Sequence, residues 1–216
     1  MPVTTPKRGR LITLEGGEGA GKSTLLRGLE TYLREQGVDL VVTREPGGTA
    51  VGEAVRGVVL DAANNELCAE AELLLMFASR AQLVRQVIEP ALAAGRWVLC
   101  DRFTDASYAY QGGGRGQPVE RIEALEGWAA LALKPDITLL LDLPVSTGRA
   151  RAAGRGEVDR IEVEGDSFFE RVRGAYRARA AAEPRRFRVL DASATPEAVL
   201  GQAIEGVAGL LAGVAS

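Results

Sequence analysis

The sequence predicts an α/β fold in which a five-stranded parallel sheet carries helices on both faces. Short runs of aliphatic and β-branched residues alternate with longer helical stretches along the 216 residues. Four of the five runs are almost continuously apolar, as expected of strands that helices cover on both sides. A glycine-rich segment also stands between the first run and the first helical stretch.

In chain order the expected strands are 10–15, 38–43, 97–101, 137–143 and 186–190. The expected helices are 22–36, 50–60, 68–94, 118–133, 145–153, 166–182 and 195–212. Two Gly-rich pieces, 45–49 and 111–116, are expected to be ligand loops, because open α/β sheets bind ligands beyond the carboxyl ends of their strands. The pattern contains neither a repeat nor a linker. Residues 1–216 are therefore expected to form a single domain with a loose leader at 1–9.

The composition excludes some kinds of catalysis and some classes of binding partner. Histidine is absent, which excludes imidazole acid–base catalysis and nucleophiles that histidine activates. Cys68 and Cys100 lack the spacing of a metal or redox pair, so we expect reduced thiols in a cytoplasmic protein. A formal charge of -3 argues against nucleic acid as a partner. Gln202 and Glu205 interrupt the apolar tail at 199–215, so no membrane partner is expected either.

The segment after the first strand has the complete pattern of a phosphate-binding loop. Its glycines allow a tight turn that aims backbone N–H groups inward, and the next helix turns the positive end of its dipole toward the phosphates. Lys22 is expected to reach the β- and γ-phosphates of ATP, and Ser23 to offer its hydroxyl to Mg²⁺. The pattern therefore predicts a P-loop NTPase fold. The expected ATP-binding residues are Gly16, Gly17, Glu18, Gly19, Ala20, Gly21, Lys22, Ser23 and Thr24.

Two other charged patterns are open to two interpretations. Asp101 and Arg102 close the third strand, where a guanidinium suits a second phosphate, although a surface ion pair would give the same pattern. Segment 149–160 is rich in arginine and small residues, and it can act as a lid over bound phosphates or as a solvated helix face. Its arginines are Arg149, Arg151, Arg155 and Arg160.

A P-loop alone does not separate a GTPase, a motor ATPase and a small-molecule kinase. The chain has no Asn-Lys-x-Asp guanine motif, and Gly16 and Gly17 stand where partitioning ATPases carry a second lysine. Its motifs together resemble those of bacterial thymidylate kinases over nearly the whole chain. The matching motifs are Leu14–Thr24, Thr43–Thr49, Cys100–Phe103, Ala109–Gly116 and Gly156–Glu162.

The resemblance implies transfer of the γ-phosphoryl group of ATP to dTMP, with Mg²⁺ between the nucleotides, to give dTDP and ADP for dTTP synthesis. It implies that Glu18 faces the deoxyribose, that Arg102 holds the acceptor phosphate, and that Asp101 joins Ser23 at the metal. It also suggests a homodimer. The implied substrate-binding residues are Glu18, Glu45, Pro46, Met76, Phe77, Arg80, Arg102, Ser107, Tyr110 and Gln111.

The resemblance gives the base pocket in more detail. Arg80 would bond to a thymine carbonyl, Ser107 would touch the base edge, and Tyr110 would crowd a ribose 2′-hydroxyl. The family's stacking aromatic usually stands four residues before the arginine, where this chain has Met76, whereas Phe77 stands three before. Either side chain can cover the ring, because both offsets lie on nearly one helical face.

Ala20 fills the loop position where some members of this family carry a transition-state arginine, so the resemblance assigns that charge to the lid at 149–160. No general base is required, because the acceptor is an ionised phosphate. The expected catalytic residues are Lys22, Arg102, Arg155, Arg151 and Arg149, with Arg160 structural through Asp159. Another nucleoside monophosphate kinase and a non-enzymatic P-loop switch are the alternative functions.

Overall fold

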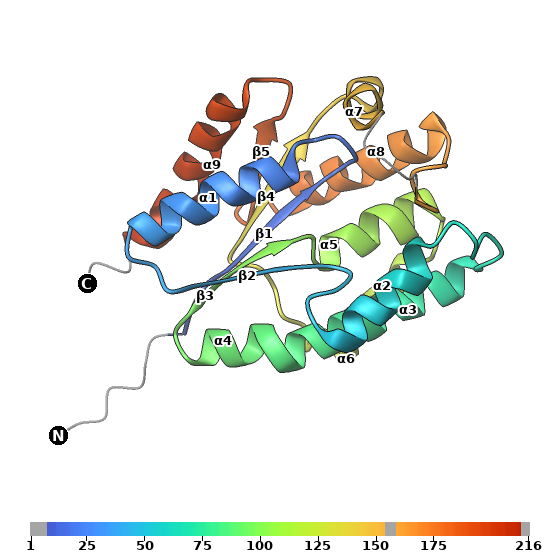
Figure 1. The fold of residues 1–216 in the computed structure, drawn as a ribbon, viewed down its shortest axis with the longest axis horizontal. Coiled ribbons are helices and arrows are strands. Elements are labelled where there is room, and N and C mark those ends of the chain that lie inside the picture. Colours follow the sequence, from blue (N-terminus) through green and yellow to red (C-terminus); the bar gives the residue numbers. More distant parts are fainter. Residues whose placement is uncertain (1–7, 154–158, 213–216) are drawn as a thin grey trace.

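The computed structural model describes residues 8–153 and 159–212. Its sheet is parallel and five-stranded, in the order β2-β3-β1-β4-β5, which confirms the predicted fold class. Figure 1 shows β1 at the centre of the sheet. The strands are β1 (Leu11–Gly16), β2 (Leu40–Arg44), β3 (Trp97–Asp101), β4 (Ile137–Asp142) and β5 (Phe187–Asp191).

Helices cover both faces of this sheet, α1 and α9 on one side and α4 on the other (Figure 1). The helices are α1 (Lys22–Glu35), α2 (Ala50–Leu60), α3 (Ala69–Leu83), α4 (Glu89–Ala93), α5 (Thr104–Ser107), α6 (Val119–Ala129), α7 (Val145–Ala152), α8 (Asp166–Ala182) and α9 (Pro196–Leu211). Two π-helices, η1 (Val84–Ile88) and η2 (Tyr108–Gly114), continue α3 and α5.

The alternation of side chains along β1 explains why both faces are apolar. Ile12 and Leu14 pack with α1 and α9, whereas Leu11 packs with η1 and α4, because successive strand residues point to opposite faces. Thr13 is also buried, and its hydroxyl bonds at 2.9 Å to that of Thr138 on β4. The central strand is thereby fixed, and its carboxyl end carries the P-loop to the edge of the sheet.

The largest difference from the sequence-based expectation concerns segment 111–116, which was expected to be a loop. Its first four residues belong to η2. Glycine disfavours helices by about 1 kcal/mol, but close packing on α8 overrides that preference here. A Cβ atom on Gly113 would lie 2.7 Å from the Cβ of Ala175, and one on Gly114 would lie 2.5 Å from the Phe168 ring. Only glycine lets η2 approach α8 so closely.

Among the helices that the structure describes, none is both long and apolar enough to cross a membrane. The helix expected at 68–94 is divided into α3, η1 and α4, whereas α2 and α8 have the predicted bounds.

Candidate active site

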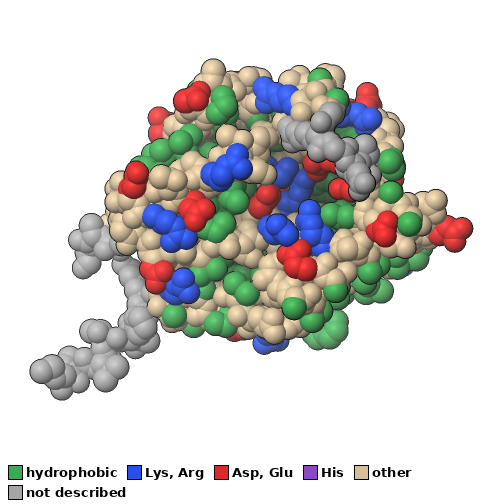
Figure 2. Space-filling model, viewed as in Figure 1, with side chains coloured by type: hydrophobic (Ala, Val, Ile, Leu, Met, Phe, Trp, Pro, Cys, Tyr) green, Lys and Arg blue, Asp and Glu red, His purple; other side chains and the backbone are tan. Residues whose placement is uncertain are grey.

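A cavity of about 350 Å³ lies at the carboxyl ends of β1, β2 and β3. Figure 2 shows Lys and Arg side chains gathered around the hollow at the centre of this face. Many of the predicted site residues line it. These are Glu18, Gly19, Ala20, Gly21, Lys22, Ser23, Thr24, Glu45, Pro46, Met76, Asp101, Arg102, Tyr110 and Gln111.

The P-loop forms one wall of this cavity. Gly19 and Gly21 have φ angles of 69° and 93°, in the left-handed region that glycine adopts without strain. Gly21 precedes α1 and no side chain caps that helix, so the N–H groups of the first turn remain available to an anion. A Cβ on Gly19 would lie 2.0 Å from the carbonyl oxygen of Gly148 on α7, which makes glycine necessary at that position.

Lys22 folds back over its own loop. Its Nζ donates to the carbonyl oxygens of Gly17 at 2.8 Å and Gly16 at 3.1 Å. Burial lowers the pKa of this ammonium, the charge of Arg102 lowers it further, and Glu18 opposes the shift. Lys22 is therefore a half-buried cation held where the β- and γ-phosphates are expected.

Arg102 is fixed by four groups. Nη2 donates to Glu18 Oε1 at 2.7 Å and to the Tyr110 hydroxyl at 3.1 Å. Nη1 donates to the Gly16 carbonyl at 2.9 Å and to the Tyr176 hydroxyl at 3.3 Å. The backbone of Arg102 has a φ angle of 69°, which is costly for a residue with a Cβ. The contacts of its side chain hold it in this conformation beside the P-loop.

Glu15 and Tyr176, neither of which was predicted as a site residue, support Arg102 from inside the protein. Glu15 Oε1 accepts from the N–H of Phe103, and Oε2 accepts from the Tyr176 hydroxyl, both at 2.7 Å. Burial raises the pKa of Glu15 to about 8, and the charge of Asp105 adds to the shift. An ionisable residue near the end of a mostly apolar strand was the signal in the sequence.

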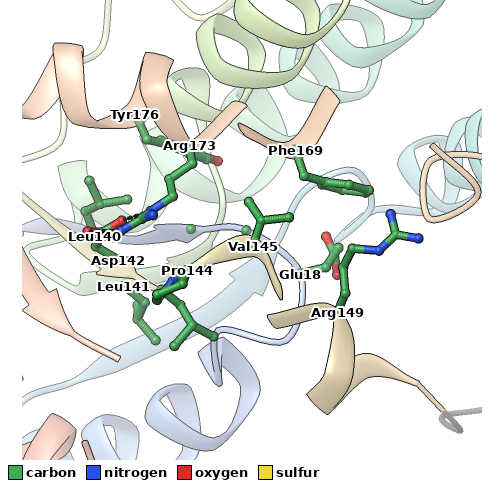
Figure 3. A pocket seen from close by; sticks show the side chains of 13 residues that line it. Glu18, Leu140, Leu141, Asp142, Pro144, Val145, Arg149, Phe169, Arg173 and Tyr176 are labelled. Carbon is green, nitrogen blue, oxygen red and sulfur yellow. Dashed lines mark hydrogen bonds and ion pairs between the residues drawn. The ribbon is translucent and has the colours of Figure 1, made fainter. Parts of the chain in front are cut away.

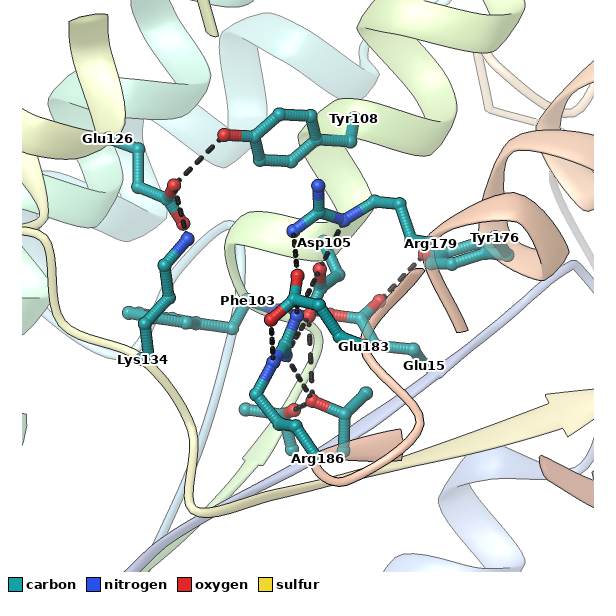
Figure 4. A network of polar contacts seen from close by, with 12 residues as sticks. Glu15, Phe103, Asp105, Tyr108, Glu126, Lys134, Tyr176, Arg179, Glu183 and Arg186 are labelled. Carbon is teal, nitrogen blue, oxygen red and sulfur yellow. Dashed lines mark hydrogen bonds and ion pairs between the residues drawn. The ribbon is translucent and has the colours of Figure 1, made fainter. Parts of the chain in front are cut away.

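A second buried network anchors α5, which follows Arg102 (Figure 4). Asp105 accepts from Arg179 Nε and from Arg186 Nη1, each at 2.6 Å. Burial opposes the charged form of Asp105, but the hydrogen bonds from Arg186 and Arg179 outweigh it and lower the pKa of this carboxyl. These contacts join α5 to α8 and to the start of β5.

The structure separates the two residues that were considered for base stacking. Met76 lines the cavity, whereas Phe77 is buried among Leu73, Tyr108 and Ile122. Phe77 is absent from the cavity wall that the described residues form. Adjacent helical residues differ by about 100° in direction, so packing of α3 decides between them.

Arg80 and Ser107 also lie behind the wall and not on it. Arg80 is fully buried, and its Nε donates to Glu45 Oε2 at 2.8 Å. Nη1 donates to the Ser107 hydroxyl and Nη2 to the Phe103 carbonyl, both at 3.0 Å. Ala106 takes the lining position next to Ser107. Arg80 therefore braces Glu45, whose own pKa is raised by burial against the effect of Arg80.

Three buried oxygens on lining residues accept no hydrogen bond from the described part of the chain. They are Glu45 Oε1, Asp101 Oδ1 and Gln111 Oε1. Buried polar atoms are rarely left unpaired in proteins. A ligand or cation bound in the cavity would lie close to the residues that carry these oxygens.

The predicted lid residues are placed in different ways. Arg149 makes an ion pair with Asp166 at 3.1 Å, and Arg151 donates to the Ala192 carbonyl at 2.8 Å. Arg160 was expected to pair with Asp159. In the structure it pairs with Glu72 instead, because its side chain enters the space between α2 and α3. Arg155 lies outside the described residues.

A smaller cavity of about 30 Å³ lies behind the P-loop (Figure 3). Asp142 and Arg173 pair at 2.7 Å on one side of it, and Arg149 and Glu18 line the other.

Arg44 and Arg56 line the main cavity and were not assigned from the sequence. Arg56 donates to the Pro46 carbonyl at 3.0 Å, so a cation stands beside Glu45 and Pro46.

Comparison with known proteins gives a consistent result. Residues 14–203 match the thymidylate kinase family. The chain is 60% identical over 188 residues to the thymidylate kinase of Pseudomonas putida strain W619, a match that covers 87% of this chain and 91% of that one. It is 55% identical to the thymidylate kinase of Halorhodospira halophila, covering 95% and 96%. The crystal structure of the Ehrlichia chaffeensis thymidylate kinase superposes with a TM-score of 0.75 at 32% identity, covering 92% and 97%.

Proposed function

Because the chain belongs to the thymidylate kinase family and is a phosphotransferase, we propose that the 350 Å³ cavity is where it transfers the γ-phosphoryl group of ATP to dTMP. The observation that carries the proposal is the position of Arg102. Its guanidinium is tied to the P-loop carbonyl of Gly16 and to Glu18, so a second phosphate site adjoins the first. Two phosphate sites side by side suit a kinase whose acceptor is itself a phosphate.

The donor phosphates would bind over the P-loop. The uncapped N-terminus of α1 offers N–H groups, and Lys22 can exchange its contacts with Gly16 and Gly17 for phosphate oxygens. Partial burial strengthens the attraction between this cation and a phosphate, because the local dielectric is lower than that of water. We assign Lys22 to neutralise the charge that develops on the transferred group.

Mg²⁺ would be held by Ser23 and Asp101. Both line the cavity, and Asp101 Oδ1 is a buried oxygen without a partner among the described residues. Mg²⁺ prefers oxygen ligands and commonly takes one or two from protein and the rest from phosphates and water. When bound, it would supply positive charge between the two nucleotides.

The acceptor would occupy the side of the cavity formed by Glu45, Met76, Tyr110 and Gln111. Met76 offers a polarizable apolar surface to the base. Glu18 faces the sugar in this arrangement, and Tyr110 crowds the position of a 2′-hydroxyl. Arg80 and Ser107 support this wall from behind.

Catalysis would consist of positioning and charge neutralisation, with Arg102 on the acceptor and arginines of segment 149–160 on the transferred group. Arg155 keeps the leading role assigned from the resemblance, followed by Arg151 and Arg149. In the structure Arg149 and Arg151 pair with Asp166 and the Ala192 carbonyl, so each would exchange a protein contact for phosphate.

A homodimer in the cytoplasm is the proposed form. Leu74 on α3 and Val119 and Trp128 on α6 have exposed fractions of 58%, 49% and 79%. Large apolar side chains on two neighbouring helices are typical of a subunit interface. Trp128→Glu is expected to give a monomer in light scattering, and an unchanged mass would contradict this interface.

An assay of ADP release across nucleoside monophosphates tests the function. With ATP and Mg²⁺, dTMP is expected to give the highest kcat/KM. Higher activity on AMP or GMP would favour another nucleoside monophosphate kinase. No ADP above background with any acceptor would favour the non-enzymatic switch.

A further inference from the structure

We propose that Glu72 is a positioning residue that sets base selectivity by holding the Gln111 amide in one orientation. Glu72 lies on α3, is 1% exposed and is absent from the cavity wall formed by the described residues. Its Oε1 accepts from Gln111 Nε2 at 2.8 Å. This inference rests on the proposed function, because it requires a pyrimidine base beside Gln111.

The chemistry of the pair determines which end of the amide faces the cavity. A carboxylate only accepts hydrogen bonds, so the group of Gln111 that faces Glu72 must be the NH₂. The remaining end, Oε1, has no partner among the described residues, and Gln111 lines the cavity. The cavity therefore presents a buried acceptor to its ligand.

A buried acceptor selects a base that offers an N–H group at that place. Thymine and uracil carry a hydrogen on N3, whereas N3 of cytosine carries a lone pair. Cytosine would leave the Gln111 oxygen unpaired and opposed by a second acceptor, which disfavours its binding. A rotated amide would reverse this preference.

Glu72 is itself held by two cations from other segments. Arg115 Nε lies 3.2 Å from Oε2, and Arg160 Nη2 pairs with the same oxygen. Arg160 is fixed in turn, because its Nε donates to the Val59 carbonyl at 2.9 Å. A buried carboxylate is tolerated only when it is paired in this way. These contacts hold the Glu72 carboxylate in place, so Gln111 has one favourable orientation.

The test uses Glu72→Gln in the full chain. A neutral amide at position 72 can both donate and accept, so Gln111 is freed to rotate. The selectivity between dTMP and dCMP, measured as kcat/KM for each and as competitive inhibition by dCMP, is expected to fall by about tenfold, which corresponds to about 1.4 kcal/mol. The KM for ATP is expected to be unchanged.

Two further variants separate this role from a structural one. Glu70→Gln makes the same change two residues earlier on α3, where the carboxylate is exposed and bonds to Gln117, and it is expected to leave selectivity unchanged. In a Gln111→Ala background, Glu72→Gln is expected to cause no further loss of selectivity. Glu72→Asp retains the charge but shortens the reach to Gln111, and it replaces Glu72→Gln if that variant does not fold.

Wild-type selectivity in a folded Glu72→Gln or Glu72→Asp variant would overturn the proposal. A loss of selectivity that persists without Gln111 would overturn it as well. Failure of the proposed function is seen separately, because the wild-type protein would then not phosphorylate dTMP.

Discussion

Nη2 of Arg102 lies 2.7 Å from Oε1 of Glu18, so the cation assigned to the acceptor phosphate and the carboxylate assigned to its sugar form one ion pair. Glu18 belongs to the P-loop, and Arg102 follows β3. The pair therefore joins the P-loop to the segment that follows β3. Charge-assisted bonds of this kind fix direction as well as distance.

Arg102→Lys tests whether the several hydrogen bonds that the guanidinium makes at once are needed. Lysine keeps the charge but cannot contact Glu18, Gly16 and a phosphate at once. We expect kcat/KM for dTMP to fall by about 10²-fold, the size of losing a preorganised donor, while the KM for ATP changes little. Initial-rate kinetics with each substrate varied would measure this. Arg34→Lys, at an exposed pair with Glu30, is the control. Equal losses in both variants would argue against a specific role for Arg102.

Lys22→Met removes the half-buried cation of the P-loop. Because its charge is expected to matter most in the transition state, kcat should fall by about 10²–10³-fold. Single-turnover kinetics would separate this chemical effect from nucleotide binding. Lys134→Met, where the ammonium pairs with Glu126 and does not line the cavity, should keep kcat near wild type. A Lys22→Met enzyme with unchanged kcat would exclude the assigned role.

Arg80→Met is expected to destabilise the fold through Glu45. The methionine leaves a carboxylate buried without its cation, and breaking such a pair costs about 3–5 kcal/mol. Urea unfolding monitored by circular dichroism would give the change in free energy of unfolding. The matched exposed change, Arg34→Met, is expected to cost at most about 1 kcal/mol. Similar losses for both variants would mean that the Arg80–Glu45 pair contributes no more than a surface pair.

Glu15 predicts a pH dependence of stability. Its pKa is about 8 in the folded chain against 4.5 for an ordinary glutamate. Between these values the folded chain holds a proton that the unfolded chain releases, so this contribution to stability falls as pH rises and levels off above about 8. The Glu15→Gln variant has no ionisable group at this position. Urea unfolding from about pH 5 to about pH 9 should therefore show the wild type losing stability relative to the variant. If the difference in free energy of unfolding between the wild type and the variant stays constant over this pH range, the pKa of Glu15 is not raised.

Local patterns were sufficient for the five strands, for several of the helices and for the position of the P-loop. β3 and α2 have the predicted bounds because their hydrophobic patterns and flanking residues are local. The P-loop is contiguous, so its residues meet by chain geometry alone. Met76 and Phe77 mark the limit of this reasoning, because rotation of α3 by one residue exchanges them.

The amino-acid sequence by itself determined the parallel sheet and the P-loop, since both follow from short-range pattern and backbone geometry. It also placed Arg102 at the end of β3, and the role of this arginine on the acceptor phosphate is the part that the resemblance implied. Only the tertiary structure decided the supports behind them. Glu72 meets Gln111 across 39 residues, and Glu15 meets Tyr176 across 161. Such pairs depend on how helices pack on the sheet. The role of a buried carboxylate depends on the hydrogen-bond donors that packing brings to it. The periodicity of the sequence does not show which donors these are.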